Sequence, residues 1–353
     1  MTRPVRISLG LVFFGVLALG ASSCGGSYII KSGFHQAELL SKREPVEAVL
    51  AGGTLSAGEE QRLRLFAEVK AFGATLGLRS THNYGTYART WDRRIWNLAA
   101  CPELSFSAKT WWFPIVGTVP YLGFFTDEDM NTWRVRLQRE GLEVSVREVG
   151  AYSTLGWFRD PILPAMLRWD EPRIAETVSH ELAHATLWIP GSVDFNESFA
   201  SVVGEAAGDA FLVHKYGAES AEVQAARDGN HDWIVFQGLL AALYEELDAV
   251  YRDSTASDAE KRERKAALYA SLDERVLAST LRQKPRWLQL VRTSTWNNPR
   301  LSQFHTYNSG EGDFARVLAE CNGDIGCFIE QIRSITAGRR DPFTALHEAV
   351  ARP

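Results

Sequence analysis

The run HELAH at residues 180–184 constrains this chain of 353 residues more than any other feature. Asp170 can cap a helix here, Pro172 fits its first turn, and apolar residues recur on one face, so the pattern predicts a helix over about 171–188. His180 and His184 then lie one turn apart on the same face, where both imidazoles can reach one metal ion. Two buried histidines beside Glu181 would be costly without a cation, which favours a Zn²⁺ site over a purely structural helix.

A catalytic zinc site usually has three protein ligands and one open position. Pro190 stands where the metzincin pattern requires a third histidine, so that class of site is excluded. Glu197 begins the next predicted helix, from which gluzincin-type sites take their third ligand. We therefore predict Zn²⁺ bound by His180, His184 and Glu197. Glu197 could instead be only a carboxylate favoured at a helix start, and Glu205 is the alternative third ligand.

The first residues predict export and a lipid anchor. Arg3 and Arg6 precede an apolar run over 7–19, and small residues lead directly into Cys24. This order resembles a bacterial lipobox, so residues 1–23 are predicted to be a lipoprotein signal peptide and 24–32 a flexible tether. Lipidation of Cys24 would hold the protein in the cell envelope, on the periplasmic face of the outer membrane. The alternative is an ordinary secretion signal with an incidental cysteine.

Residues 33–353 are predicted to form one catalytic domain of the α+β class, mostly helical and zincin-like. A composition of 45% hydrophobic and 23% charged residues is that of a folded domain. Apolar and aromatic runs over about 94–122 and an alternating run over 142–149 predict a small mixed sheet. Helices are expected to dominate the C-terminal half from about 215. The predicted helices cover about 57–76, 126–140, 171–188, 196–214, 231–253 and 258–283, with two shorter ones after 312.

Three further cysteines follow Cys24 in the chain. Cys321 and Cys327 could close a small loop and leave Cys101 as a buried thiol. Spacing alone does not determine the pairing, so it stays open.

Several motifs resemble a family of bacterial lipoproteins described as predicted aminopeptidases. They are YGTY at 84–87, WWFPIVG at 111–117, AYSTLGWF at 151–158 followed by Asp160-Pro161, HELAH, DFNESFA at 194–200, and Trp296-Asn297-Asn298 with Tyr307. The resemblance covers most of the mature chain in collinear order and implies a zinc-dependent peptidase. This chain departs from the family in having Gly204 followed by Glu205 where the family has a glutamate near position 204. The GxMEN element that holds a peptide N-terminus in classical zinc aminopeptidases is absent, so aminopeptidase specificity comes from the resemblance alone.

The remaining parts of a peptidase site are predicted from their place in the chain. The strand over 142–149 precedes HELAH where gluzincins have the edge strand that pairs with an extended substrate, and Tyr152 with Gly156-Trp157 could line the cleft or simply pack the sheet. Tyr307 and His305 are the candidate oxyanion donors, although a loop hydrogen bond is their ordinary alternative.

These observations predict a zinc peptidase that acts on a peptide substrate with Glu181 as general base, and the resemblance implies an aminopeptidase. Two other hypotheses remain open: a non-catalytic lipoprotein scaffold, and a zinc hydrolase of cell-wall amides. A net charge of -5 excludes a basic surface for nucleic acid. The sequence does not separate exopeptidase from endopeptidase action.

Overall fold

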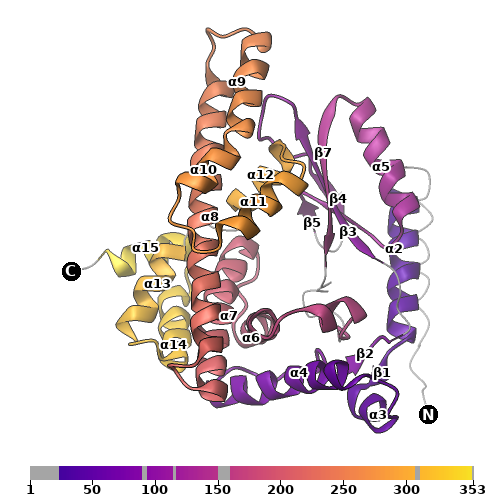
Figure 1. The fold of residues 1–353 in the computed structure, drawn as a ribbon, viewed down its shortest axis with the longest axis vertical. Coiled ribbons are helices and arrows are strands. Elements are labelled where there is room, and N and C mark those ends of the chain that lie inside the picture. The colour runs from indigo at the N-terminus through magenta and orange to yellow at the C-terminus, as the bar shows by residue number, and fades with distance from the viewer. Residues whose placement is uncertain (1–23, 90–93, 114–116, 150–159, 307–310, 352–353) are drawn as a thin grey trace, which may run out of the picture.

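The computed structural model describes residues 24–89, 94–113, 117–149, 160–306 and 311–351 (Figure 1). Most of these residues are helical, and short strands form three small sheets. None of the described helices is both long and apolar enough to cross a membrane. The predicted signal peptide, residues 1–23, lies outside the described residues.

The N-terminal part contains three helices and two very short strands. They are α2 (Cys24–Ser41), β1 (Glu44–Pro45), α3 (Val46–Ala51), α4 (Ala57–Thr75) and β2 (Thr86–Tyr87). The helix predicted over 57–76 is confirmed as α4, whose capping box forms because Ser56 Oγ accepts from the Glu59 N–H and the Ser56 N–H donates to Glu59 Oε2 (2.9 Å). Residues 24–32, expected to be a flexible tether, are helical instead. Tyr28 fixes them, because its hydroxyl donates to the Gly123 carbonyl (2.9 Å).

The largest sheet has three antiparallel strands in the order β6-β3-β7. The strands of this sheet are β3 (Ile95–Pro102), β6 (Leu122–Phe124) and β7 (Leu142–Val149). Between β3 and β6 lies a separate hairpin of β4 (Trp111–Phe113) and β5 (Gly117–Val119), and between β6 and β7 lies the helix α5 (Asp127–Arg139). The predicted strand over 142–149 is confirmed. A mixed sheet was expected, but every described strand pair is antiparallel. In the three-stranded sheet, β3 lies between β6 and β7 and pairs antiparallel with each. The isolated bridge between Tyr87 and Ile162 is parallel.

Two adjacent helices, α6 (Glu171–Thr186) and α7 (Val193–Tyr216), form the centre of the main hydrophobic core. Asp170 caps α6 as predicted, accepting from the Arg173 N–H (3.2 Å). The 3-10 turn η1 (Pro164–Arg168) precedes α6. Two of the last helices, α13 (Glu311–Glu320) and α14 (Ile325–Thr336), pack against α7. The helix α15 (Pro342–Val350) packs on α13 and α14, and its Phe343 contacts Phe195 of α7.

Of the cysteine pairings left open, the structure has the disulfide Cys321–Cys327, which links α13 to α14. Cys101 is free and buried in β3. Burial raises the pKa of its thiol to about 12, so it is neutral at physiological pH.

A second hydrophobic core lies among the helices that follow α7. They are α8 (Ala221–Arg252), α9 (Asp258–Ala270), α10 (Leu272–Ala278), α11 (Lys284–Thr293) and α12 (Asn298–Thr306). The helix expected over 258–283 is divided at Ser271, whose hydroxyl donates to the Leu268 carbonyl (2.7 Å) and competes with the backbone of a continuous helix. All the described elements from α8 onward are helices.

The three-stranded sheet stands between α5 and α12 (Figure 1). Asn298 is fully buried at the start of α12 and connects the sheet region to the helices of the second core. Its side-chain amide donates to the Glu103 carbonyl (2.9 Å) and accepts from the hydroxyls of Tyr251 and Tyr269 (2.7 and 2.9 Å). Its backbone N–H donates to Glu143 Oε2 (3.0 Å). This network fixes α12 relative to β7.

Candidate metal centre

The two helices α6 and α7 approach each other closely because glycines face the contact. A Cβ atom on Gly204 would lie 2.9 Å from the Glu176 carbonyl oxygen and 3.1 Å from His180 Cβ. A Cβ on Gly208 would lie 3.2 Å from the Glu176 nitrogen. The backbone of α7 therefore reaches the helix that carries HELAH with no side chain between them at these positions.

The connection between α6 and α7 is fixed by one buried amide. Asn196 Nδ2 donates to the Ile189 carbonyl and Asn196 Oδ1 accepts from the Ile189 N–H, both at 2.8 Å. Asn196 is 1% exposed, so both bonds are shielded from water. The sequence marked Asn196 only as part of a motif. Its structural role is to hold the start of α7, and with it Glu197, against the end of α6.

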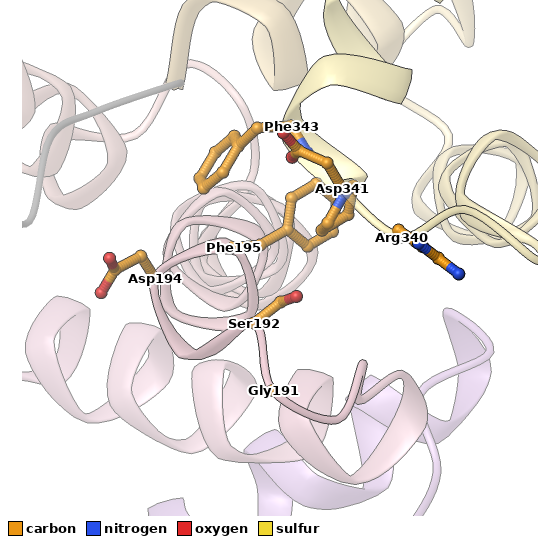
Figure 2. A pocket seen from close by; sticks show the side chains of 8 residues that line it. Gly191, Ser192, Asp194, Phe195, Arg340, Asp341 and Phe343 are labelled. Atoms are coloured by element: carbon orange, nitrogen blue, oxygen red, sulfur yellow. The ribbon is translucent and has the colours of Figure 1, made fainter. Parts of the chain in front are cut away.

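A cavity of about 350 Å³ lies at the start of α7 but does not contain the metal centre. Its lining comes from the beginning of α7 and from the segment that enters α15: Gly191, Ser192, Asp194, Phe195, Arg340, Asp341, Pro342 and Phe343. Figure 2 shows the Asp194 carboxylate pointing away from Arg340, on the far side of the Phe195 ring. Because Phe195 and Phe343 pack edge to face (5.1 Å between centroids), we assign this cavity to the packing of α15 on α7.

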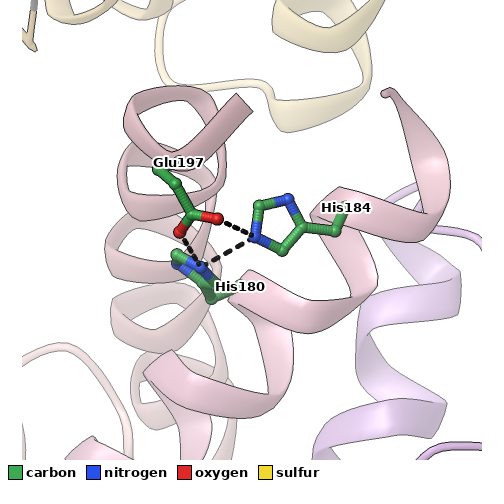
Figure 3. A group of neighbouring side chains, drawn as sticks. All are labelled: His180, His184 and Glu197. Carbon is green, nitrogen blue, oxygen red and sulfur yellow. Dashed lines mark hydrogen bonds and ion pairs between the residues drawn. The ribbon is translucent and has the colours of Figure 1, made fainter. Parts of the chain in front are cut away.

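Three predicted ligands converge between α6 and α7 (Figure 3). The Nε2 atoms of His180 and His184 lie 3.0 Å apart, and each lies 3.4 Å from a carboxylate oxygen of Glu197. An ion bound tetrahedrally at zinc's usual ligand distances would separate its ligand atoms by about 3.3 Å. The donor set and spacing therefore fit Zn²⁺.

The Glu197 carboxylate and the His180 ring affect each other's protonation. Burial acts to raise the pKa of Glu197, but hydrogen bonds and charge from His180 and His184 outweigh it and lower that pKa to about 2. Burial acts to lower the pKa of His180, but Glu197 raises it above the ordinary value. The Glu197 carboxylate is thus ionised at neutral pH and stabilises positive charge beside it.

The orientation of His184 leaves Nε2 as its atom for a metal. Its Nδ1 is buried and has no hydrogen-bond partner among the described residues. The ring also meets Trp188 edge to face, with centroids 5.5 Å apart, and Trp188 is 38% exposed. Sequence reasoning assigned Trp188 no role, although its position one turn after His184 could have suggested this contact. An exposed aromatic ring therefore borders the candidate centre.

Glu181, the predicted general base, follows His180 on α6 and is partly exposed. Tyr84, which sequence reasoning did not assign to the site, lies close enough to Glu181 for the Glu181 charge to affect the pKa of its phenol. Burial raises the pKa of the Tyr84 phenol well above its usual value, and the charges of Glu181 and Asp160 raise it further. Tyr84 has a left-handed backbone (φ 58°), uncommon for a residue with a side chain, and its N–H donates to the Asp160 carbonyl (2.8 Å). It places a neutral buried phenol near the candidate base.

The other predicted site residues are not brought into this cluster. Glu205, the alternative third ligand, is exposed about two turns beyond Glu197 on α7 and is not among the converging groups. His305 belongs to α12, but its side chain lies outside what is described. Tyr307, Tyr152 and the pair at 156–157 also lie outside the described residues.

Two histidines from an HExxH helix and a glutamate from the next helix are the ligand set typical of catalytic zinc sites. Residues 27–342 match the model of the family described as "Putative aminopeptidase", and the chain belongs to this family. The membership supports peptidase function at a coarse level. No curated protein and no solved structure matches the chain.

Proposed function

We propose that the chain is a zinc-dependent peptidase, with His180, His184 and Glu197 as zinc ligands and Glu181 as general base. The observation that carries the proposal is the convergence of the three ligand atoms within 3.0 to 3.4 Å of one another. When bound there, Zn²⁺ supplies a Lewis acid that polarises a carbonyl and makes water more acidic. The family description favours an aminopeptidase within this class.

The residues of the chain perform the proton transfers. Glu181 accepts a proton from the water whose oxygen attacks the carbonyl carbon, and donates it to the amine as the carbon–nitrogen bond breaks. Its position next to His180 and its partial exposure support this role. His305 and Tyr307 remain our candidates for stabilising the oxyanion.

An extended substrate can pair with the edge of β7 that faces away from β3. Within the described sheet, β7 pairs only with β3. Asn297 Nδ2 donates to the Val144 carbonyl (3.0 Å), so the backbone groups of Val144 point away from β3. Because strand residues alternate, those of Val146 and Glu148 face the same open edge. This supports β-strand pairing as the binding mode of the substrate.

The test of the mechanism replaces Glu181 by glutamine. Glu181→Gln should keep zinc and the fold but lose hydrolysis by on the order of a hundredfold to ten-thousandfold, because an amide cannot accept the proton. His184→Ala should lose both metal and activity. Zinc content, melting temperature and turnover of a mixed peptide library would be measured for all three proteins. Full activity in Glu181→Gln would overturn the mechanism, and zinc binding without cleavage of any peptide would favour a scaffold or a hydrolase of cell-wall amides.

We also propose that Cys24 is lipidated and anchors the mature protein in the bacterial cell envelope. The proposal is supported by the order of Arg3, Arg6, the apolar run and the small residues before Cys24. Labelled fatty acid should appear on the protein made in a bacterium and should be absent from Cys24→Ser. Unlabelled wild-type protein would refute the anchor and leave the peptidase proposal intact.

A further inference from the structure

Two arginine side chains flank the contact between α12 and the sheet. Arg147 of β7 lies opposite Asn97 of β3 in the strand register. Asn97 Oδ1 accepts a hydrogen bond from Gln303 Nε2 (2.9 Å), and Gln303 lies one turn after Arg300 on α12. Both arginines therefore lie beside the Asn97–Gln303 hydrogen bond.

Neither arginine forms an ion pair with a carboxylate among the described residues. The Arg300 guanidinium lies over the Trp296 ring (4.9 Å to the centroid), and its Nη2 donates to Ser294 Oγ (3.1 Å). Its Nε is buried and has no hydrogen-bond partner in the described structure. Burial lowers the pKa of Arg300, and the positive charge of Arg147 lowers it further. Two like charges and an unused buried donor are a combination that an anion would stabilise.

The pair lies where a bound peptide would pass. Arg147 stands between Val146 and Glu148, the two residues whose backbone groups face the open edge of β7. Alternation along the strand directs the Arg147 side chain to the face of the sheet that packs on α12, as with Glu143, which contacts Asn298. A substrate strand on this edge would thus run past the arginine pair.

We infer that Arg147 and Arg300 bind a carboxylate of the peptide substrate. The planar guanidinium fork matches the two oxygens of a carboxylate, and Arg300 has a donor to spare. The carboxylate can be the C-terminus of a short peptide or an acidic side chain. This inference rests on the proposed peptidase function for its ligand, but its test does not require catalysis.

The experiment measures binding of peptides to the zinc-free protein by calorimetry. Three probes are compared: Ala-Ala-Ala with a free C-terminus, its C-terminal amide, and Ala-Glu-Ala amide. At least one carboxylate probe should bind about tenfold or more tightly than the neutral amide. The probe that gains affinity identifies the source of the carboxylate.

Arg147→Gln should abolish this advantage without unfolding the protein, because Arg147 is exposed. Arg134→Gln, which removes the same charge from an exposed position on α5, is the matched control and should keep the advantage. Equal affinity for all three probes, including no measurable binding, overturns the inference, and so does an advantage that survives in Arg147→Gln. Turnover of the peptide library by the zinc-loaded wild type, measured separately, shows whether the peptidase proposal fails instead.

Discussion

Glu197 and Glu205 are carboxylates on the same helix, but only Glu197 reaches the histidines. Glu197→Ala should weaken zinc binding by about a hundredfold or more, because it removes one of the three proposed ligands. Glu205→Ala, the matched control, should leave the affinity nearly unchanged. Competition against a chelator of known zinc affinity would measure both. The reverse order of effects would transfer the third-ligand role to Glu205.

At the scale of single residues, the sequence predicted which three side chains converge better than which residues hold them in place. The spacing of His180, His184 and Glu197 follows from helix geometry and is visible in the chain itself. The roles of Asn196 and Tyr84 depend on which backbone groups meet after folding, such as the Ile189 peptide and the Asp160 carbonyl. No local sequence pattern predicts those contacts, so the sequence identified both residues as parts of motifs but did not predict their structural roles.

At the scale of elements, α6 and α7 depend on Gly204 for their close contact. Gly204→Ala should lower the free energy of unfolding by about 1 to 3 kcal/mol, because the new methyl group would lie 2.9 Å from the Glu176 carbonyl oxygen. It should also weaken zinc binding, because the same methyl group approaches His180. Urea unfolding and zinc competition would measure the two effects.

The control for this variant is Gly238→Ala on α8. Gly238 is exposed, and a Cβ there would have no atom within 4 Å. Alanine should be neutral or stabilise the protein by up to about 1 kcal/mol, since it favours helix over glycine. Equal stability of Gly204→Ala and wild type would show that the two helices can separate without cost.

The elements that the sequence located most accurately have strong local signals. The Ser56–Glu59 capping box and the alternation over β7 predicted α4 and β7 closely. By contrast, α8 begins at Ala221, ten residues before the predicted start at 231. The prediction missed these residues because the first turns of α8 bury only Val223 and so lack an apolar stripe. The short helices α11 and α12 were not predicted, since each is stabilised mainly by tertiary contacts.

For the molecule as a whole, Asn298 connects the sheet to the second helical core. Asn298→Ala should lower the free energy of unfolding by about 3 kcal/mol, because it removes the acceptor of the Tyr251 and Tyr269 hydroxyls and one of the donors to the Glu103 carbonyl. That carbonyl keeps its hydrogen bond from Lys265 Nζ (2.7 Å). Asn131→Ala, at an exposed position on α5, should change it by no more than about 0.5 kcal/mol. Chemical denaturation of both variants would test this, and similar midpoints would show that the network adds little.

The α+β class and the helical C-terminal half were predictable, because they follow from local periodicity and composition. The antiparallel order β6-β3-β7 was not, because pairing between strands far apart in the chain has no local signature. The same holds for the Arg147–Arg300 pair, which two segments about 150 residues apart bring together.

The two hydrogen bonds between Asn196 and the Ile189 backbone close the short connection from α6 to α7. The three proposed ligands therefore all lie within residues 180–197. The strand β7 precedes this connection in the chain, whereas α12, which carries Arg300, follows about a hundred residues later. During folding, contacts between neighbouring segments form sooner than contacts between distant ones. A folding chain therefore brings the three proposed zinc ligands together before it joins both sides of the proposed substrate site. On the proposed mechanism, a partly folded chain can take up its metal while it is still unable to position a peptide for cleavage.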